Sequence, residues 1–255
     1  MENELIKEYL NLLHQFYQKY QKKIGEREVG VMLSGGIDSS IIAYFASNYF
    51  PKTLFFTLAA DERSDDIFYA KILSKKLNKN LEIIFYQKND VEKIRKKVEE
   101  ILIKDKIAIT STQLSLACAF YLICQKVKEE NISYLFTGQG PDILLAGYHK
   151  YKNIKKEKLN EEIKKDLPLL TIDKKRDNAL ANYFQIKLIN PYLEKDFIDF
   201  ALKVQPEFKV NLIKNEVYEK YLSRKVAKFL KLPEKIILRH KKALQYSTKI
   251  RGCIK

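Results

Sequence analysis

The stretch Val29-Gly-Val-Met-Leu-Ser-Gly-Gly-Ile-Asp-Ser-Ser40 decides the fold. An apolar run, Val29 to Leu33, is followed by two glycines and then by an amphipathic stretch from Ile37 to Tyr49. This pattern predicts a buried strand, a tight turn and the start of a helix. The first turn of a helix exposes backbone N–H groups and the positive end of its dipole, and glycines let the main chain approach an anion closely. We therefore expect a phosphate-binding loop, in which Gly35 and Gly36 face the anion.

The other side chains of this loop suit a polyphosphate that is accompanied by a metal ion. Ser34, Ser39 and Ser40 supply hydroxyl donors, and Asp38 supplies a carboxylate that could hold Mg²⁺. The sequence G-x-x-x-x-G-K-[ST] does not occur in the chain, so this is not an ordinary kinase or GTPase loop. A glycine turn that serves geometry alone is the weaker interpretation, because the strand, loop and helix signals coincide as a phosphate loop requires.

The composition indicates a soluble protein. The 255 residues are 46% hydrophobic, without an apolar run of the length needed to span a membrane. The charged N-terminus has no signal-peptide pattern, so we expect a cytoplasmic protein that does not associate with membranes. The three cysteines form neither a C-x-x-C pair nor a zinc-ligand spacing, and Cys118 and Cys124 fall in an apolar stretch where buried thiols are expected.

The chain is strongly basic, with 47 Lys and Arg against 32 Asp and Glu and a net charge of +15. Such a balance attracts polyanions, of which ATP and RNA are the obvious examples. The lysines are spread through Lys/Glu-rich stretches such as 155–165 and do not form one basic arm. Binding of tRNA is therefore retained as an alternative and not as the leading hypothesis.

Strand and helix patterns alternate through the first part of the chain. Strands are expected at 29–33, 54–58, 81–86 and 133–137, and helices at 3–23, 37–49, 65–77, 91–103 and 113–128. This alternation predicts an α/β fold with a doubly wound, mostly parallel sheet. Ligands bind at the carboxyl ends of such strands, so the loops after Leu33, Leu58 and Thr137 should meet in one crevice. We include Leu58 among the expected nucleotide-binding residues for this reason.

The later part of the chain has a different character, and we expect three regions. Residues 1–27 form an N-terminal helix, 28–150 an ATP-binding α/β core, and 151–255 a helical C-terminal part packed on the core. Helices in this last region are expected at 155–165, 173–187, 195–204 and 216–230. The break near residue 150 is not marked by a flexible Gly/Ser linker.

Residues 34–40 resemble the pyrophosphate loop of the N-type ATP pyrophosphatases, and further segments narrow the resemblance to the synthase domain of asparagine synthetase. Ser64 to Ala70 is similar to that family's Ser-Asp-Glu-x-x-Tyr-Ala element. Residues 137–148 are similar to its second glycine loop, Ser-Gly-Glu-Gly-Ala-Asp-Glu-x-x-x-Gly-Tyr. Other similar segments are Pro191-Tyr-Leu-Glu194, Lys220-Tyr-Leu-Ser-Arg224, Leu232-Pro-Glu234 and Arg239-His-Lys-Lys242.

The resemblance implies an adenine nucleotide α hydrolase-like fold, ATP and Mg²⁺ as ligands, and roles for single residues. Asp38 and Asp142 are implied to hold Mg²⁺, and Gly138 and Gly140 to border the nucleotide. Lys220 is implied to neutralise charge that develops on the attacked carbonyl and on pyrophosphate. A fixed cation is also what such a transfer needs on physical grounds. Arg239 and Lys241 are open to two interpretations, a phosphate clamp or ordinary surface charge.

The chain departs from the family's pattern at positions that touch the substrate. Gln139 stands where the family has a glutamate thought to handle the proton of incoming ammonia, and an amide cannot act as a base. Ile143 replaces the next acidic residue. The family's arginine for the substrate carboxylate is expected in the helix before the fourth strand, but residues 107–127 contain no arginine, and Gln113 or Ser115 stands near its place. Aspartate is therefore a doubtful substrate, because a carboxylate requires a cationic fork.

The nitrogen source is not evident from the sequence. The family's glutaminase domain begins with a cysteine after the initiator methionine, whereas residue 2 here is Glu and the phosphate loop starts at Ser34. We expect free ammonia, another amine or a separate glutaminase subunit to supply nitrogen.

The leading hypothesis is an ATP-dependent ligase of asparagine synthetase type that forms AMP and pyrophosphate, adenylates a carboxylate and transfers it to ammonia or an amine. Lys220, Asp142 and Gln139 are its expected catalytic residues. One alternative is a tRNA-modifying enzyme that adenylates a base, although paired cysteines and an added RNA-binding domain are absent from the sequence. Another is a nucleotide-binding subunit of a larger complex that has lost catalysis.

Overall fold

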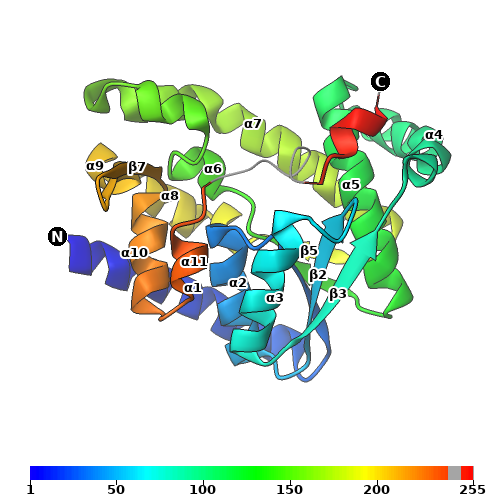
Figure 1. Ribbon diagram of the computed structural model, residues 1–255, viewed down its shortest axis with the longest axis horizontal. Coiled ribbons are helices and arrows are strands. Elements are labelled where there is room, and N and C mark those ends of the chain that lie inside the picture. Colours follow the sequence, from blue (N-terminus) through cyan, green and yellow to red (C-terminus); the bar gives the residue numbers. More distant parts are fainter. Residues whose placement is uncertain (241–247, 255) are drawn as a thin grey trace.

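The structure is a computed structural model that describes residues 1–240 and 248–254. Its centre is a five-stranded sheet in the order β3-β2-β1-β4-β5, in which all neighbouring strands run parallel (Figure 1). The strands are β1 (Val29–Met32), β2 (Thr53–Ala59), β3 (Asn80–Phe85), β4 (Tyr134–Phe136) and β5 (Lys187–Ile189). The predicted doubly wound, parallel architecture is confirmed.

Helices cover both faces of the sheet and enclose two hydrophobic cores. Consecutive residues of a strand point to opposite faces, so Phe55 belongs to one core and Phe56 to the other, and both are fully buried. The first core is covered by α1 (Glu2–Ile24), α2 (Ile37–Tyr49), α3 (Asp65–Leu77), α8 (Lys195–Lys203) and α10 (Tyr221–Phe229). The second is covered by α4 (Lys88–Lys104), α5 (Ser111–Glu129) and the end of α7 (Lys156–Tyr183).

The predicted elements of the first 140 residues agree with the structure to within a few residues. The Ser64 hydroxyl accepts a hydrogen bond from the Asp66 N–H at the start of α3, as its predicted capping role requires. Cys118 and Cys124 are buried in α5, and burial raises the pKa of both thiols. They are structural residues as predicted.

The C-terminal part contains strands that the sequence analysis did not predict. β5 comes from this part and joins the sheet beside β4, and β6 (Val210–Ile213) and β7 (Glu216–Glu219) form an antiparallel hairpin. The expected helix over 216–230 is therefore wrong in its first residues. Lys214 and Asn215, which connect the two strands, both have positive φ, as a two-residue hairpin turn requires. The boundaries at residues 27 and 150 remain predictions.

Helix α7 replaces two of the expected helices. It runs without interruption from Lys156 to Tyr183, with Pro168 inside it, where separate helices were expected at 155–165 and 173–187. The second expected helix is wrong at its end, because the helix stops at Tyr183 and Lys187 begins β5. Figure 1 shows it crossing the molecule, and it packs against α6 (Pro141–Leu144), α9 (Pro206–Lys209) and α5. The remaining short elements are α11 (Glu234–Ile237) and the 3₁₀ helices η1 (His149–Asn153), η2 (Pro191–Leu193) and η3 (Ile250–Cys253). None of the helices in the described part combines the length and apolarity needed to cross a membrane.

The buried lysine Lys209, which contacts α7 through Asn160, should make the free energy of unfolding depend on pH. Lys209 is fully buried, and its ammonium donates a hydrogen bond to Asn160 Oδ1 at 2.9 Å. Burial lowers the pKa of Lys209 to about 8. The folded state therefore binds this proton less tightly than the unfolded state, and the free energy of unfolding should rise as the pH increases from about 8 towards the ordinary lysine pKa of about 10.4.

The substitution Lys209→Met removes the free-energy cost of burying the charged ammonium. We expect the variant to be more stable than the wild type by roughly 2 kcal/mol at pH 7, with a difference that shrinks above pH 8. Urea unfolding of both proteins at pH 7, 9 and 10 measures it. A difference that stays constant over this range would contradict the assignment.

Candidate functional site

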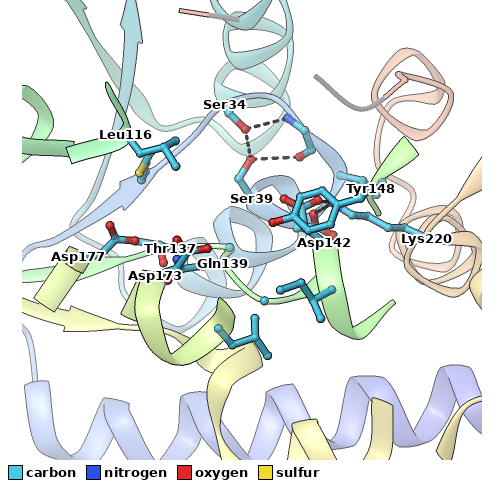
Figure 2. Close-up of a pocket in the computed structure, with 18 of the residues that line it drawn as sticks. Ser34, Ser39, Leu116, Thr137, Gln139, Asp142, Tyr148, Asp173, Asp177 and Lys220 are labelled. Carbon is cyan, nitrogen blue, oxygen red and sulfur yellow. Dashed lines mark hydrogen bonds and ion pairs between the residues drawn. The ribbon is translucent and has the colours of Figure 1, made fainter. Parts of the chain in front are cut away.

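The predicted phosphate loop lies between β1 and α2. Gly35 has a φ of 67°, and a Cβ there would lie 2.4 Å from the Tyr69 Cβ, so only glycine fits. The hydroxyls of Ser34 and Ser39 lie 3.2 Å apart, the Gly36 N–H donates to Ser34 Oγ, and Ser39 Oγ donates to the Gly36 carbonyl (Figure 2). These bonds fix the shape of the loop at the N-terminus of α2, where the first backbone N–H groups of a helix have no partner within the helix.

The second glycine loop, which follows β4, packs directly on the first. A Cβ at Gly138 would lie only 2.7 Å from the Ser39 backbone nitrogen, and Gly140 has a φ of 124°. The loop ends in α6, whose first turn carries Asp142. The two loops are thus brought together at the carboxyl ends of β1 and β4, as predicted for the loops after Leu33 and Thr137. Of the segment that follows Leu58, residues 59–66, only Asp66 in the first turn of α3 lines the same cavity.

Lys220 reaches the two loops from the start of α10. Its ammonium forms ion pairs with Asp38 Oδ2 and, at 2.5 Å, with Asp142 Oδ1, and its side chain is 3% exposed. Burial alone would lower the pKa of Lys220, but the charges of Asp142 and Asp38 outweigh it and raise the pKa. A permanent positive charge is therefore fixed between the carboxylates of the two loops.

The chemistry of this pair of carboxylates fits a magnesium ion. Asp38 and Asp142 both contact the same ammonium, so their oxygens converge on one region of the site. In the part of the chain that the structure describes, no group of three or more His, Cys, Asp and Glu residues could hold a metal. Mg²⁺ commonly takes one or two protein carboxylates and completes its coordination with phosphate and water. Two carboxylates beside a phosphate loop match that requirement.

Arg239 is a buried part of the site and not a surface charge. Its Nη1 donates to the Ser34 carbonyl at 2.5 Å, its Nη2 pairs with Asp66 Oδ1, and its guanidinium lies 4.4 Å from the centre of the Tyr69 ring. It ties the phosphate loop to α3. Lys241, the other half of the predicted clamp, lies outside the described residues.

These elements border a cavity of about 490 Å³. Ten of the expected site residues line it, as binding residues should: Ser34, Gly36, Asp38, Ser39, Gly138, Gln139, Gly140, Asp142, Lys220 and Arg239. Gly35, Ser40 and Leu58 do not line it, and Ser40 and Leu58 are buried in the protein. The Tyr148 side chain faces the same space, and burial followed by the charge of Asp142 raises the pKa of its hydroxyl, which keeps it protonated.

One group of lining residues was missed by the sequence analysis. Arg176 of α7 donates from Nη1 to Asp173 Oδ1 at 2.6 Å and to Gln113 Oε1 at 2.8 Å, and from Nε to Asp177 Oδ1 at 2.8 Å. An arginine therefore does lie beside Gln113, but it comes from α7 and not from α5. The only sequence signal was the helical pattern Asp-x-x-Arg-Asp at 173–177, which alone does not distinguish a site from a surface ion pair.

A second missed residue is Gly147, which lies in the segment 137–148 but was not predicted to have a role. A Cβ at this position would lie 2.0 Å from Lys220 Cε and 2.7 Å from Asp142 Oδ1. Gly147 therefore provides the space in which the Lys220 side chain lies.

Comparison with known proteins gives consistent matches. The sequence model of the family described as Asparagine synthase matches residues 19–190 and 163–252. A putative glutamine-hydrolysing asparagine synthetase of Methanocaldococcus jannaschii is 29% identical over 199 residues, which cover 76% of this chain and 36% of that protein. Asparagine synthetase B of Escherichia coli is 28% identical over 223 residues, covering 78% and 39%. The chain thus spans little more than a third of the length of these curated relatives.

The comparison with solved structures gives two matches that cover most of this chain. The NH3-dependent NAD synthetase of Campylobacter jejuni has a TM-score of 0.46 and 17% sequence identity, with 91% of this chain and 76% of that chain covered. The NMN synthetase of Francisella tularensis has a TM-score of 0.44 and 16% identity, with coverage of 94% and 74%.

Proposed function

Because this chain belongs to the asparagine synthase family, we propose that it uses ATP to activate a carboxylate and transfers the acyl group to ammonia or an amine, with release of AMP and pyrophosphate. The observation that carries this proposal is the position of Lys220, whose ammonium joins a carboxylate of the phosphate loop to a carboxylate of the second glycine loop. This arrangement supports the proposal because the expected polyphosphate-binding residues and a fixed cation line one cavity.

The first half of the proposed reaction occurs at the phosphate loop. The β- and γ-phosphates bind to the N-terminus of α2 and to the hydroxyls of Ser34 and Ser39. An oxygen of the substrate carboxylate forms a bond to the α-phosphorus, the bond from that phosphorus to pyrophosphate breaks, and an acyl-adenylate remains. Lys220 stabilises the negative charge that develops during this exchange. Asp38 and Asp142 would hold Mg²⁺, which would neutralise phosphate charge when bound.

The second half is attack of a nitrogen nucleophile on the acyl carbon, which expels AMP. The nitrogen must lose a proton, and Gln139 cannot accept it because an amide is not a base. We propose that Gln139 positions the nucleophile by hydrogen bonding and that the proton passes to water or to a neighbouring carboxylate. Ammonia can come from solution or from another protein.

The products test this proposal directly. Protein incubated with Mg·ATP, ammonium and a pool of carboxylic acids should generate AMP and pyrophosphate in equal amounts, as followed by ³¹P NMR, and omission of the acids should prevent it. ADP and orthophosphate as primary products would contradict cleavage at the α-phosphorus. A parallel reaction with bulk tRNA in place of the acids tests the base-modifying alternative, which the net charge of +15 favours.

A further inference from the structure

Lys220 has an uncommon backbone conformation. It is the residue before the first turn of α10, and its φ of 56° and ψ of 40° lie in the left-handed region. Residues other than glycine adopt this region rarely, and they keep it only where the surrounding structure fixes the backbone. With this backbone the Lys220 ammonium lies between Asp38 and Asp142. The position of the ammonium therefore depends on the groups that fix the main chain here.

Arg224 bonds to the peptide groups on both sides of Lys220. Its Nε donates to the Glu219 carbonyl at 2.8 Å, and its backbone N–H donates to the Lys220 carbonyl at 3.0 Å. The first carbonyl belongs to the peptide group before Lys220, and the second to the one after it. Because peptide groups are planar, fixing two of them limits the φ and ψ of the residue between them. The second bond is an ordinary helical one, so the Arg224 side chain supplies the specific restraint.

The same guanidinium also holds the segment that carries Arg239. Its Nη1 donates to the Ile237 carbonyl and, at 3.0 Å, to the Arg239 carbonyl, where the chain leaves α11. Helices α10 and α11 pack side by side (Figure 1). Arg239 in turn contacts the phosphate loop through the Ser34 carbonyl. One buried side chain thus links two cations of the site that come from different parts of the chain.

The remaining contacts of Arg224 hold its guanidinium in place. The side chain is 2% exposed, and the guanidinium lies 4.6 Å from the centre of the Tyr218 ring. The Glu219 carboxylate is 3.9 Å from Nη2 and pairs with Lys152 at 2.7 Å. Arg224 therefore directs its shorter hydrogen bonds to main-chain carbonyls. A planar fork of N–H groups reaches carbonyls in several directions, whereas the donors of a lysine radiate from a single nitrogen.

We infer that Arg224 is a positioning residue, which fixes Lys220 and Arg239 relative to the phosphate loop. Its kinetic consequences rest on the proposed function, whereas its structural consequences do not. Without the guanidinium, the Glu219 and Arg239 carbonyls lose this donor. The backbone at Lys220 can then leave the left-handed region, which moves the ammonium away from its two carboxylates. Arg224 thus acts through both cations and not through a contact of its own with the reacting atoms.

Two substitutions separate positioning from charge. Arg224→Lys keeps the buried charge without the planar fork, and Arg224→Gln keeps a donor without the charge. In pyrophosphate release with the pool of carboxylic acids, we expect kcat to fall by about tenfold or more in both variants and the KM for Mg·ATP to rise by about threefold or more. A purely structural role would lower the folded fraction, and with it kcat, but would leave KM unchanged. Wild-type kinetics in Arg224→Lys, or a lower kcat with an unchanged KM, would overturn the inference.

Arg95→Gln is the matched control, since the Arg95 side chain is 43% exposed on α4 and pairs with Glu99. It should behave as the wild type.

NMR of the lysine ammonium groups tests the inference without turnover. In protein labelled with ¹⁵N at the lysine Nζ, the signal of Lys220 is the one that Lys220→Ala lacks. Burial and two carboxylate partners should protect this ammonium from exchange with water and keep its signal visible in the wild type. We expect the signal to shift or to be lost in folded Arg224→Gln and to remain in Arg95→Gln. An unchanged Lys220 signal in Arg224→Gln would overturn the inference. A wild-type protein that releases no pyrophosphate with any acid contradicts the proposed function alone.

Discussion

Replacing Lys220 by alanine should reduce pyrophosphate release by about a thousandfold or more. A fixed charge that stabilises a transition state commonly contributes two to three orders of magnitude in rate, and Lys220 also holds the two loops together. Its ammonium contacts Asp38 and Asp142 while only 3% of its side chain is exposed. The same substitution leaves two neighbouring carboxylates without their shared cation. We therefore also expect a loss of about 3 kcal/mol in the free energy of unfolding.

Magnesium should distinguish this interpretation from a general loss of packing. If Asp38 and Asp142 hold Mg²⁺, the ion can replace the missing charge, and it should raise the melting temperature of Lys220→Ala more than that of the wild type. Lys225→Ala is the control, because Lys225 lies on the same helix and pairs with Glu2 near the surface. It should retain both turnover and stability. A Lys220→Ala protein with more than a tenth of wild-type turnover would refute the catalytic role.

The strand, glycine turn and helix start around residues 34–40 were predictable because every signal in this stretch is local. The apolar run, the two glycines and the helix that starts at Ile37 lie within one short stretch, and each of them limits the backbone by itself. Lys220 has no such signal in its own surroundings. It was identified by resemblance, since a lysine at the start of a helix among many lysines is otherwise unremarkable in sequence.

The contacts of Arg176 with Gln113, Asp173 and Asp177 were not predictable for a physical reason. Arg176 and Gln113 are 63 residues apart and meet only because α7 continues past Pro168 and packs against α5. The helix before β4 contains no arginine, and the guanidinium beside Gln113 comes from Arg176 of α7 instead. Strand β5 was missed because it begins at Lys187, the last residue of the helix expected over 173–187, and it becomes a strand by pairing with β4. Strand β7 was missed because Glu216-Val-Tyr-Glu219 also fits a charged helix.

The second large effect is expected at a residue that performs no chemistry. Gly147→Ala adds a Cβ that would lie 2.0 Å from the present position of Lys220 Cε and 2.9 Å from the Asp142 Cα. A flexible lysine end could normally move aside, but this one is buried and bound to two carboxylates. We expect it to be displaced and turnover to fall by about a hundredfold or more, the loss that follows when a preorganised charge leaves its position.

Gly252→Ala provides the matched control, since among the described residues, its chain neighbours aside, a Cβ there would have no atom within 4 Å. It should behave as the wild type. The double variant Gly147→Ala/Lys220→Ala separates a steric effect on the lysine from damage elsewhere. Without the Lys220 side chain the shortest of these clashes is removed, while the added Cβ would still lie 2.7 Å from Asp142 Oδ1 and 2.9 Å from the Asp142 Cα. The two losses should therefore be non-additive, and the activity of the double variant should lie closer to that of Lys220→Ala than to the product of the two single losses. Losses that multiply would show that Gly147 acts independently of Lys220. Non-additive losses would identify Gly147 as the residue that positions the catalytic ammonium, because its missing side chain is the space in which that ammonium is held.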